Sequence, residues 1–133
     1  MSVEIGSTFR DPTRKVETHL FVIISKVTDD EKVVVTNFTS FVGAEWQDDT
    51  CIILPEEYKQ LSRSSCISYS DSNLVSFANL EHAVESGGIA LSDCVPENVL
   101  NKILAGAAES EYLENNLKNI LDEQGLLPEE PAL

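Results

Sequence analysis

The chain has 133 residues, 42% of them apolar, which is enough to bury the core of one domain. Its formal net charge is −14, and residues 81–133 carry eleven acids against only Lys102 and Lys118. Nucleic-acid binders usually carry a basic stripe, because phosphate contacts supply much of their affinity. The charge therefore counts against an extended nucleic-acid surface and leaves room for a small local one.

The first half of the chain predicts short β-strands. Residues 6–9, "GSTF", begin an edge strand, and "HLFVIIS" (19–25) is an apolar, β-branched run typical of a strand covered on both faces. "KVVVTNF" (32–38) is a second run of this kind, and the turn at 28–31 joins the two as a hairpin. Further strands are expected at 50–54, 65–70 and 72–76. Five or six short strands with brief connections favour a small closed antiparallel barrel.

The second half predicts helices. One covers "FANLEHAVESGG" and ends at Gly87, and a second begins at Pro96 with apolar residues at helical spacing. Ser110 is expected to cap a third helix that ends near Gly125. The whole chain, 1–133, is thus read as a single domain: a barrel over about 1–77, a helical part over 78–124 and a flexible tail over 125–133.

Several classes of protein and site find no support in the sequence. No apolar run approaches the ~20 residues that span a bilayer, and the N-terminus does not resemble a signal peptide, so we expect a soluble cytoplasmic protein without membrane contact. Cys51, Cys66 and Cys94 form no CxxC pair and are expected to be small buried residues. The chain has only two histidines and no nucleotide-binding or hydrolase motif, so we expect no metal and no cofactor.

Polar residues at the predicted strand ends are the candidate site. In an antiparallel hairpin the start of one strand lies beside the end of the next. His19 should therefore share one rim with "TNFTS", which contains Asn37, Thr39 and Ser40. Arg63 precedes a later strand and Tyr69 lies within it, while Arg10, Arg14 and Lys15 form the one local basic cluster.

Each of these residues also has a purely structural interpretation. A lone histidine at a strand start is commonly solvated or hydrogen-bonded, and Asn37 and Thr39 can satisfy the backbone of a turn. Tyr69 can cover the core with its hydroxyl in water. Arg63 can pair with Glu56 or Glu57 at the surface, where such a pair contributes about 0–1 kcal/mol.

The pattern "GSTF … HLFVIIS … VVVTNFTS … DDTCIIL … SSCISYSD" resembles PemK/MazF-like proteins, the toxins of bacterial toxin–antitoxin pairs, and in particular an uncharacterised PemK-like subgroup. The likeness covers about residues 5–76. It implies an SH3-like, PemK/CcdB-like barrel, usually a homodimer, that cleaves single-stranded RNA without metal and is inhibited by an antitoxin.

The resemblance also implies roles for individual residues. His19 stands where the toxins place an arginine before their apolar strand, and Thr39 and Ser40 stand at their "TS". In this chemistry the ribose 2′-hydroxyl attacks the adjacent phosphate, so His19 would transfer protons while Thr39 and Ser40 orient the phosphate. The family's loop position implies substrate binding by Arg10, Arg14 and Lys15, and we expect Asn37, Arg63 and Tyr69 to join them from the strand ends.

Two hypotheses follow. The first is an endoribonuclease toxin or a degenerate relative of one. The second is a non-catalytic small-barrel module whose acidic surface binds a protein partner. Because one small fold hosts many functions, the fold alone does not choose between them.

Overall fold

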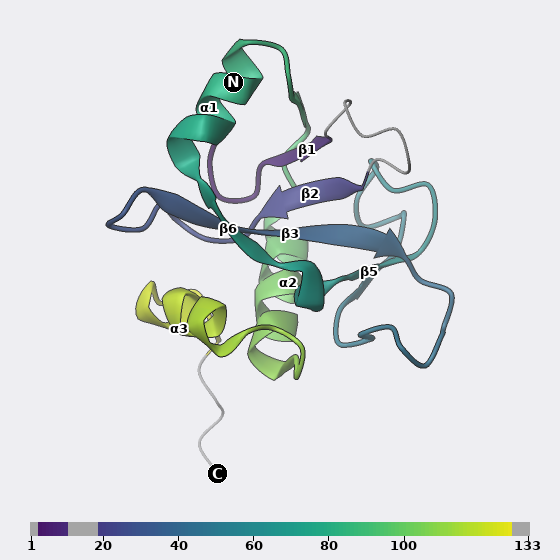
Figure 1. Ribbon diagram of the computed structural model, residues 1–133. Coiled ribbons are helices and arrows are strands. Elements are labelled where there is room, and N and C mark those ends of the chain that lie inside the picture. Colours follow the sequence, from purple (N-terminus) through teal and green to yellow (C-terminus); the bar gives the residue numbers. More distant parts are fainter. Residues whose placement is uncertain (1–2, 11–18, 129–133) are drawn as a thin grey trace.

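A computed structural model describes residues 3–10 and 19–128 of the chain. It contains an antiparallel sheet crossed by helices on both sides (Figure 1). The strands are β1 (Thr8–Arg10), β2 (Leu20–Ile23), β3 (Lys32–Ser40), β4 (Ile52–Ile53), β5 (Ser65–Ile67), β6 (Asn73–Ser76) and β7 (Ala90–Ser92). The helices are α1 (Phe77–Glu85), α2 (Glu97–Glu109) and α3 (Asn115–Glu123), with a 3-10 turn, η1 (Tyr69–Asp71).

The nine-residue β3 is the centre of the sheet. The strand order is β4-β5-β3-β2-β1-β7, and β6 pairs with β3 as well. One edge of β3 pairs with β2. Along the other edge, the first half of β3 pairs with β6 and its last residues pair with β5. The predicted hairpin of β2 and β3 is confirmed, with Leu20 opposite Phe38 and Ile23 opposite Val35.

A mainly β protein with C-terminal helices is confirmed. The seven described strands form one open sheet whose ends are β4 and β7, so a closed barrel is not what they form. The N-terminal strand was expected at an edge, and this is wrong, because β7 pairs with the outer side of β1. The sequence interpretation missed β7 altogether.

Both faces of the sheet are buried, as the apolar runs predict. On one face, Val34 and Phe38 of β3 pack with Ile103 and Leu121 of α2 and α3. On the other face, Val33 and Val35 pack in a smaller cluster with Leu80 of α1 and with Phe9 and Ile23. Alternate side chains of one strand thus join two cores.

The helix ends differ in one place from the expectation. Gly87, with φ +82°, follows the end of α1, as the sequence predicts, and the Ser76 hydroxyl, which was not predicted to do so, caps its start. Ser110, however, ends α2 and does not cap α3, because α3 begins only at Asn115, after Glu114, and the Ser110 hydroxyl accepts instead from the backbone N–H of Tyr112. Leu126 and Leu127, in the segment expected to be a tail, pack against the larger core.

Cys51 and Cys66 are buried as expected, whereas Cys94 is exposed. None of the helices in the described ranges is long and apolar enough to cross a membrane.

Candidate functional site

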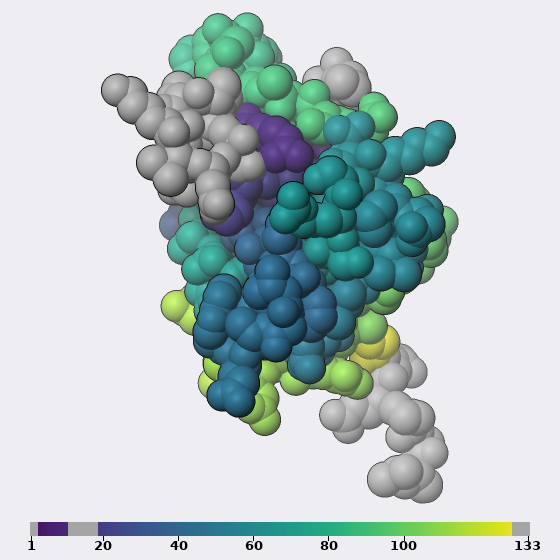
Figure 2. Space-filling view, turned by 90° about the vertical axis from the view of Figure 1, so that its right-hand side faces the viewer, coloured from purple at the N-terminus to yellow at the C-terminus, as the bar shows by residue number. Residues whose placement is uncertain are grey.

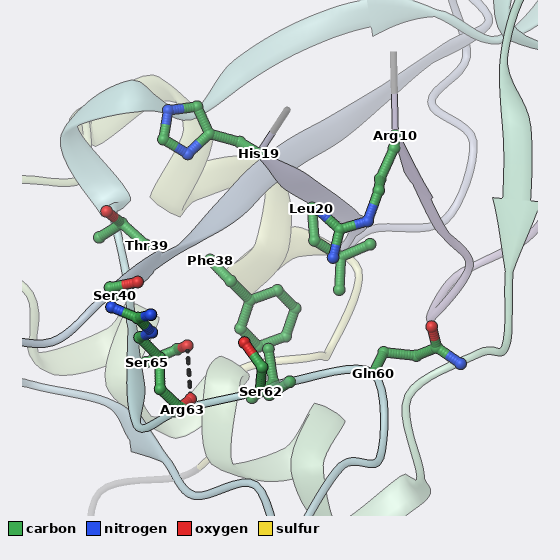
Figure 3. Close-up of a pocket in the computed structure, with 11 residues that line it drawn as sticks. Arg10, His19, Leu20, Phe38, Thr39, Ser40, Gln60, Ser62, Arg63 and Ser65 are labelled. Carbon is green, nitrogen blue, oxygen red and sulfur yellow. Dashed lines mark hydrogen bonds between the residues drawn. The ribbon is translucent and has the colours of Figure 1, made fainter. Parts of the chain in front are cut away.

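The rim expected from the hairpin exists, and it borders an open pocket of about 330 Å³ (Figure 3). The register that sets Leu20 opposite Phe38 brings His19 to the end of β3, where Thr39 and Ser40 lie. The pairing of Ser40 with Ser65 adds the segment that precedes β5, and β1 adds Arg10 beside β2. Four chain segments therefore meet at this pocket.

Three basic side chains, Arg10, His19 and Arg63, line the pocket, and we call it the cationic pocket. None of the described residues that line it is acidic, although the chain as a whole has a formal charge of −14. Arg63 is exposed and reaches toward Ser40 in Figure 3. An opening lined in this way favours an anionic ligand, because each guanidinium group donates charge-assisted hydrogen bonds to oxyanions.

Arg63 does not pair with Glu56 or Glu57, its alternative partners in the structural interpretation. Within the described ranges it forms no salt bridge. Glu57 instead accepts hydrogen bonds from Lys102, with both carboxylate oxygens 3.1 Å from Nζ, and from the backbone N–H of Leu54. The surface-pair interpretation of Arg63 is therefore wrong for this structure.

Neutral hydrogen-bonding groups complete the wall of the cationic pocket. They are the side-chain amide of Gln60 and the hydroxyl groups of Thr39, Ser40, Ser62 and Ser65. The Gln60 amide lies 3.4 Å from an Asp93 carboxylate oxygen, and the Ser65 hydroxyl donates to the Arg63 carbonyl at 3.1 Å. Hydroxyl donors beside guanidinium groups suit the several oxygens of a phosphate.

An apolar floor supports the cationic pocket. Leu20, Phe38 and Leu61 form the apolar part of the lining, and Phe38 packs against Tyr58 with ring centroids 5.9 Å apart. The Tyr58 hydroxyl lies 2.8 Å from the Thr8 hydroxyl and also donates to the Asp93 carbonyl. Burial raises the pKa of Tyr58, so this hydroxyl remains a neutral structural link between β1 and the loop that follows β4.

Two residues predicted to bind substrate are buried instead. Tyr69 is 1% exposed, and its hydroxyl donates to the Ile103 carbonyl of α2 at 2.6 Å. Asn37 is 3% exposed, and its amide donates to the Phe38 carbonyl at 3.3 Å. Both side chains serve the fold. Arg14 and Lys15 lie outside the described residues.

Sequence reasoning missed Gln60 and Ser62 as lining residues. A polar run, "SRSS" at 62–65, stands directly before a strand and was the available signal. Gln60 has no such signal, because the fold of the loop after β4 brings it to the opening. In Figure 2 the end of β3 (blue), this loop (teal) and the start of the chain (purple) meet on one face of the molecule.

No family model, no curated protein and no solved structure matches this chain. The resemblance to PemK/MazF-like proteins therefore rests on the sequence pattern alone.

Proposed function

We propose that the cationic pocket binds a phosphate of single-stranded RNA and that the protein is a metal-independent endoribonuclease. One observation carries the proposal: Arg10, His19 and Arg63 line a single open pocket to which no described acidic residue contributes. In a chain this acidic, a local concentration of positive charge points to an anionic ligand.

The lining groups match the demands of phosphodiester cleavage by a neighbouring hydroxyl. The 2′-oxygen forms a bond to phosphorus as it loses its proton, and the bond from phosphorus to the 5′-oxygen breaks as that oxygen gains a proton. A cyclic phosphate and a free 5′-hydroxyl result. An imidazole exchanges protons near neutral pH, so His19 is the group that transfers them. The two arginines, with Thr39 and Ser40, stabilise the charge on the phosphate oxygens.

The experiment is incubation of the full chain with end-labelled single-stranded RNA in the presence of a chelator. We expect products with 2′,3′-cyclic phosphate ends. The variant His19→Ala should lose about a hundredfold or more in rate, since general acid–base catalysis contributes about 10²–10⁴-fold. Thr39→Ala should lose less, because a neutral hydroxyl is one of several donors to the phosphate.

The chain offers a matched control in His82, its other histidine, which is exposed on α1 and does not line the cationic pocket. His82→Ala should cleave at the rate of the unaltered protein. Equal losses in both histidine variants, or an absence of cleavage by the unaltered protein together with normal growth of cells that express it, would sink the proposal.

The proposal extends to the fold family and the partners that the resemblance implies. The open sheet would be a variant of the small barrel of PemK/MazF-like toxins, acting as a homodimer. An antitoxin with an acidic segment would fit the cationic pocket by charge. Sedimentation of the purified chain checks the dimer, and competition between an acidic peptide and RNA checks the inhibitor.

A second candidate is a non-catalytic module that binds a protein. It is favoured by a surface outside the cationic pocket, where Glu45, Asp49, Glu109 and Glu111 line a depression beside Asp48 and Tyr112. Such a surface suits a basic segment of a partner. A chain that binds a lysine-rich peptide at this surface and neither binds nor cleaves RNA would support this candidate over the ribonuclease.

A further inference from the structure

Thr39 lines two pockets at once. One is the cationic pocket, and the other is a neighbouring pocket of about 280 Å³ that Thr39 shares with Trp46, Asp48, Cys66, Asp71 and Tyr112. We call this second opening the aromatic pocket. A single side chain at the end of β3 therefore belongs to the walls of both pockets. In a nucleotide the ribose likewise lies between the phosphate and the base, so two adjoining pockets can hold these two groups.

Trp46 is the only tryptophan of the chain, and it is 76% exposed. When a ligand covers a large aromatic ring that was exposed to water, the free energy falls because apolar area is buried. Bases of single-stranded nucleic acids stack on rings of this kind, next to a positively charged groove that holds the backbone. The aromatic and cationic pockets stand in this relation.

The loop that carries Trp46 is held by the side chain of Gln47. Its amide donates to the Ser40 carbonyl at 2.8 Å, and its oxygen accepts from the backbone N–H of Val42 at 2.9 Å. The backbone N–H of Gln47 also donates to the Ala44 carbonyl at 3.0 Å. The segment next to Trp46 is thus fastened to the end of β3, where both pockets begin.

The opposite wall of the aromatic pocket is joined to the same loop. Asp48 accepts hydrogen bonds from Thr50 with one carboxylate oxygen and from the Ser110 hydroxyl, at 2.6 Å, with the other. Ser110 in turn accepts from the backbone N–H of Tyr112 at 3.1 Å. Asp48 therefore couples the loop with Trp46 to the turn with Tyr112.

The charges of the two pockets differ, and this assigns their contents. Asp48 and Asp71 make the aromatic pocket unfavourable for a phosphate, which has like charge. A neutral base is not repelled. Among residues 3–10 and 19–128, the exposed Asp71 carboxylate accepts one hydrogen bond, from the Ser68 hydroxyl at 2.7 Å, and an ionised carboxylate has sites for about four. Exocyclic amino groups of adenine, cytosine and guanine are suitable further donors.

We infer that the aromatic pocket holds a base of the RNA strand whose phosphate lies in the cationic pocket. The base stacks on Trp46, and its amino group donates to Asp71. Bases that carry an amino group are therefore preferred to uracil. This inference rests on the proposed function, since it places the base relative to a bound phosphate.

The test uses the full chain and short 2′-O-methyl oligonucleotides, which lack the attacking hydroxyl. Binding is followed by the anisotropy of a labelled oligoadenylate and, separately, by the fluorescence of Trp46. We expect oligoadenylate to quench this fluorescence. Trp46→Ala should weaken its binding roughly ten- to a hundredfold, and Trp46→Phe should restore most of the affinity.

Matched controls separate stacking from general effects on the loop. Val42, in the same loop, is 72% exposed, does not line the aromatic pocket, and Val42→Ala should leave binding unchanged. An abasic oligonucleotide of the same length should bind without quenching the fluorescence of Trp46. Its affinity should be the same for Trp46→Ala and for the unaltered protein. Oligouridylate should bind about tenfold more weakly than oligoadenylate, and Asp71→Asn should narrow this difference.

The outcomes distinguish this inference from the function on which it rests. Suppose that oligoadenylate binds, that Arg63→Gln weakens its binding and that Trp46→Ala does not. The phosphate site is then supported and the base site is wrong. If no oligonucleotide binds, the proposed function fails and the inference fails with it. If a lysine-rich peptide then quenches the fluorescence of Trp46, the aromatic pocket binds a basic protein partner instead.

Discussion

Leu20 lies opposite Phe38 in the hairpin of β2 and β3, and this register brings His19 to the end of β3 next to Thr39. His19 and Thr39 are twenty positions apart in the sequence, and they meet because the turn at Thr28–Lys32 has a fixed length. A one-residue slip would send every side chain of the strand to the opposite face. The chemistry of the rim therefore depends on the hairpin.

Arg63 is predicted to contribute directly to phosphate binding. Arg63→Gln should weaken the binding of an uncleavable oligonucleotide about ten- to a hundredfold, because a charge-assisted hydrogen bond to the phosphate is lost. In a plot of the logarithm of the association constant against the logarithm of the salt concentration, the steepness of the slope should also fall by about 0.7. This is the change expected for one phosphate contact of a single strand. Both are measured by anisotropy over a range of salt.

Lys59 supplies the control for this experiment. It carries the same charge in the same loop, is exposed and does not line the cationic pocket. Lys59→Gln should change the affinity little. If the two variants lose affinity equally, the net charge of the loop is responsible and Arg63 has no special place in the site.

Tyr69 is predicted to serve the fold alone. Tyr69→Phe removes the hydrogen bond to the Ile103 carbonyl and should lower the free energy of unfolding by about 1 kcal/mol. Oligonucleotide affinity should not change. Urea unfolding and anisotropy measure the two quantities, and a loss of affinity without a loss of stability would return Tyr69 to the binding site.

Gly106 is predicted to be essential to the packing of α2. A Cβ at this position would meet the Tyr69 hydroxyl and would lie 2.8 Å from Cys51 Cβ. Gly106→Ala should therefore destabilise the protein by about 1–3 kcal/mol through overpacking, although alanine is favoured over glycine in a helix by about 1 kcal/mol. Thermal unfolding measures the change.

Tyr69→Phe offers a way to check the cause, since it removes the nearest atom. In the Tyr69→Phe background, Gly106→Ala should cost less than in the unaltered protein. Equal costs in the two backgrounds would mean that the Tyr69 hydroxyl is not the obstacle.

Stability is predicted to fall at alkaline pH because of Cys51. Burial raises the pKa of its thiol from an ordinary 9.0 to about 11. The unfolded chain releases this proton near pH 9, whereas the folded protein keeps it until about pH 11. The stabilisation is thus complete below pH 9 and is lost as pH rises from 9 to 11, at up to about 1.4 kcal/mol per pH unit.

Urea unfolding at several pH values measures this slope, and Cys51→Ala should make it shallower. Burial also raises the pKa of Cys66 and of Tyr69, so some slope of the same sign remains in the variant. An unchanged slope in Cys51→Ala would contradict the assignment to this thiol.

The sequence was sufficient to predict the rim and most of the elements around it. Apolar, β-branched runs on either side of a polar turn define the hairpin of β2 and β3 locally, so His19, Thr39 and Ser40 follow from pairing alone. The amphipathic helices and the glycine after α1 are equally local signals.

Tertiary pairing accounts for the failures. Asn37 stands in a polar stretch, yet its side chain is buried, because burial depends on what covers the face of the sheet and not on the local residue pattern. The three residues of β7 carry almost no strand signal, and their pairing with β1 places an expected edge strand inside the sheet. Gln60 reaches the cationic pocket through the path of a loop, which no residue pattern encodes.

The four hydrogen bonds of the Gln47 side chain and backbone have a consequence for the kinetics of recognition. Their formation during folding restricts the loop around Trp46 before a ligand arrives, so association need not wait for the loop to order and loses little conformational entropy. Differences in affinity among RNA sequences should then appear mainly as differences in how long each one stays bound.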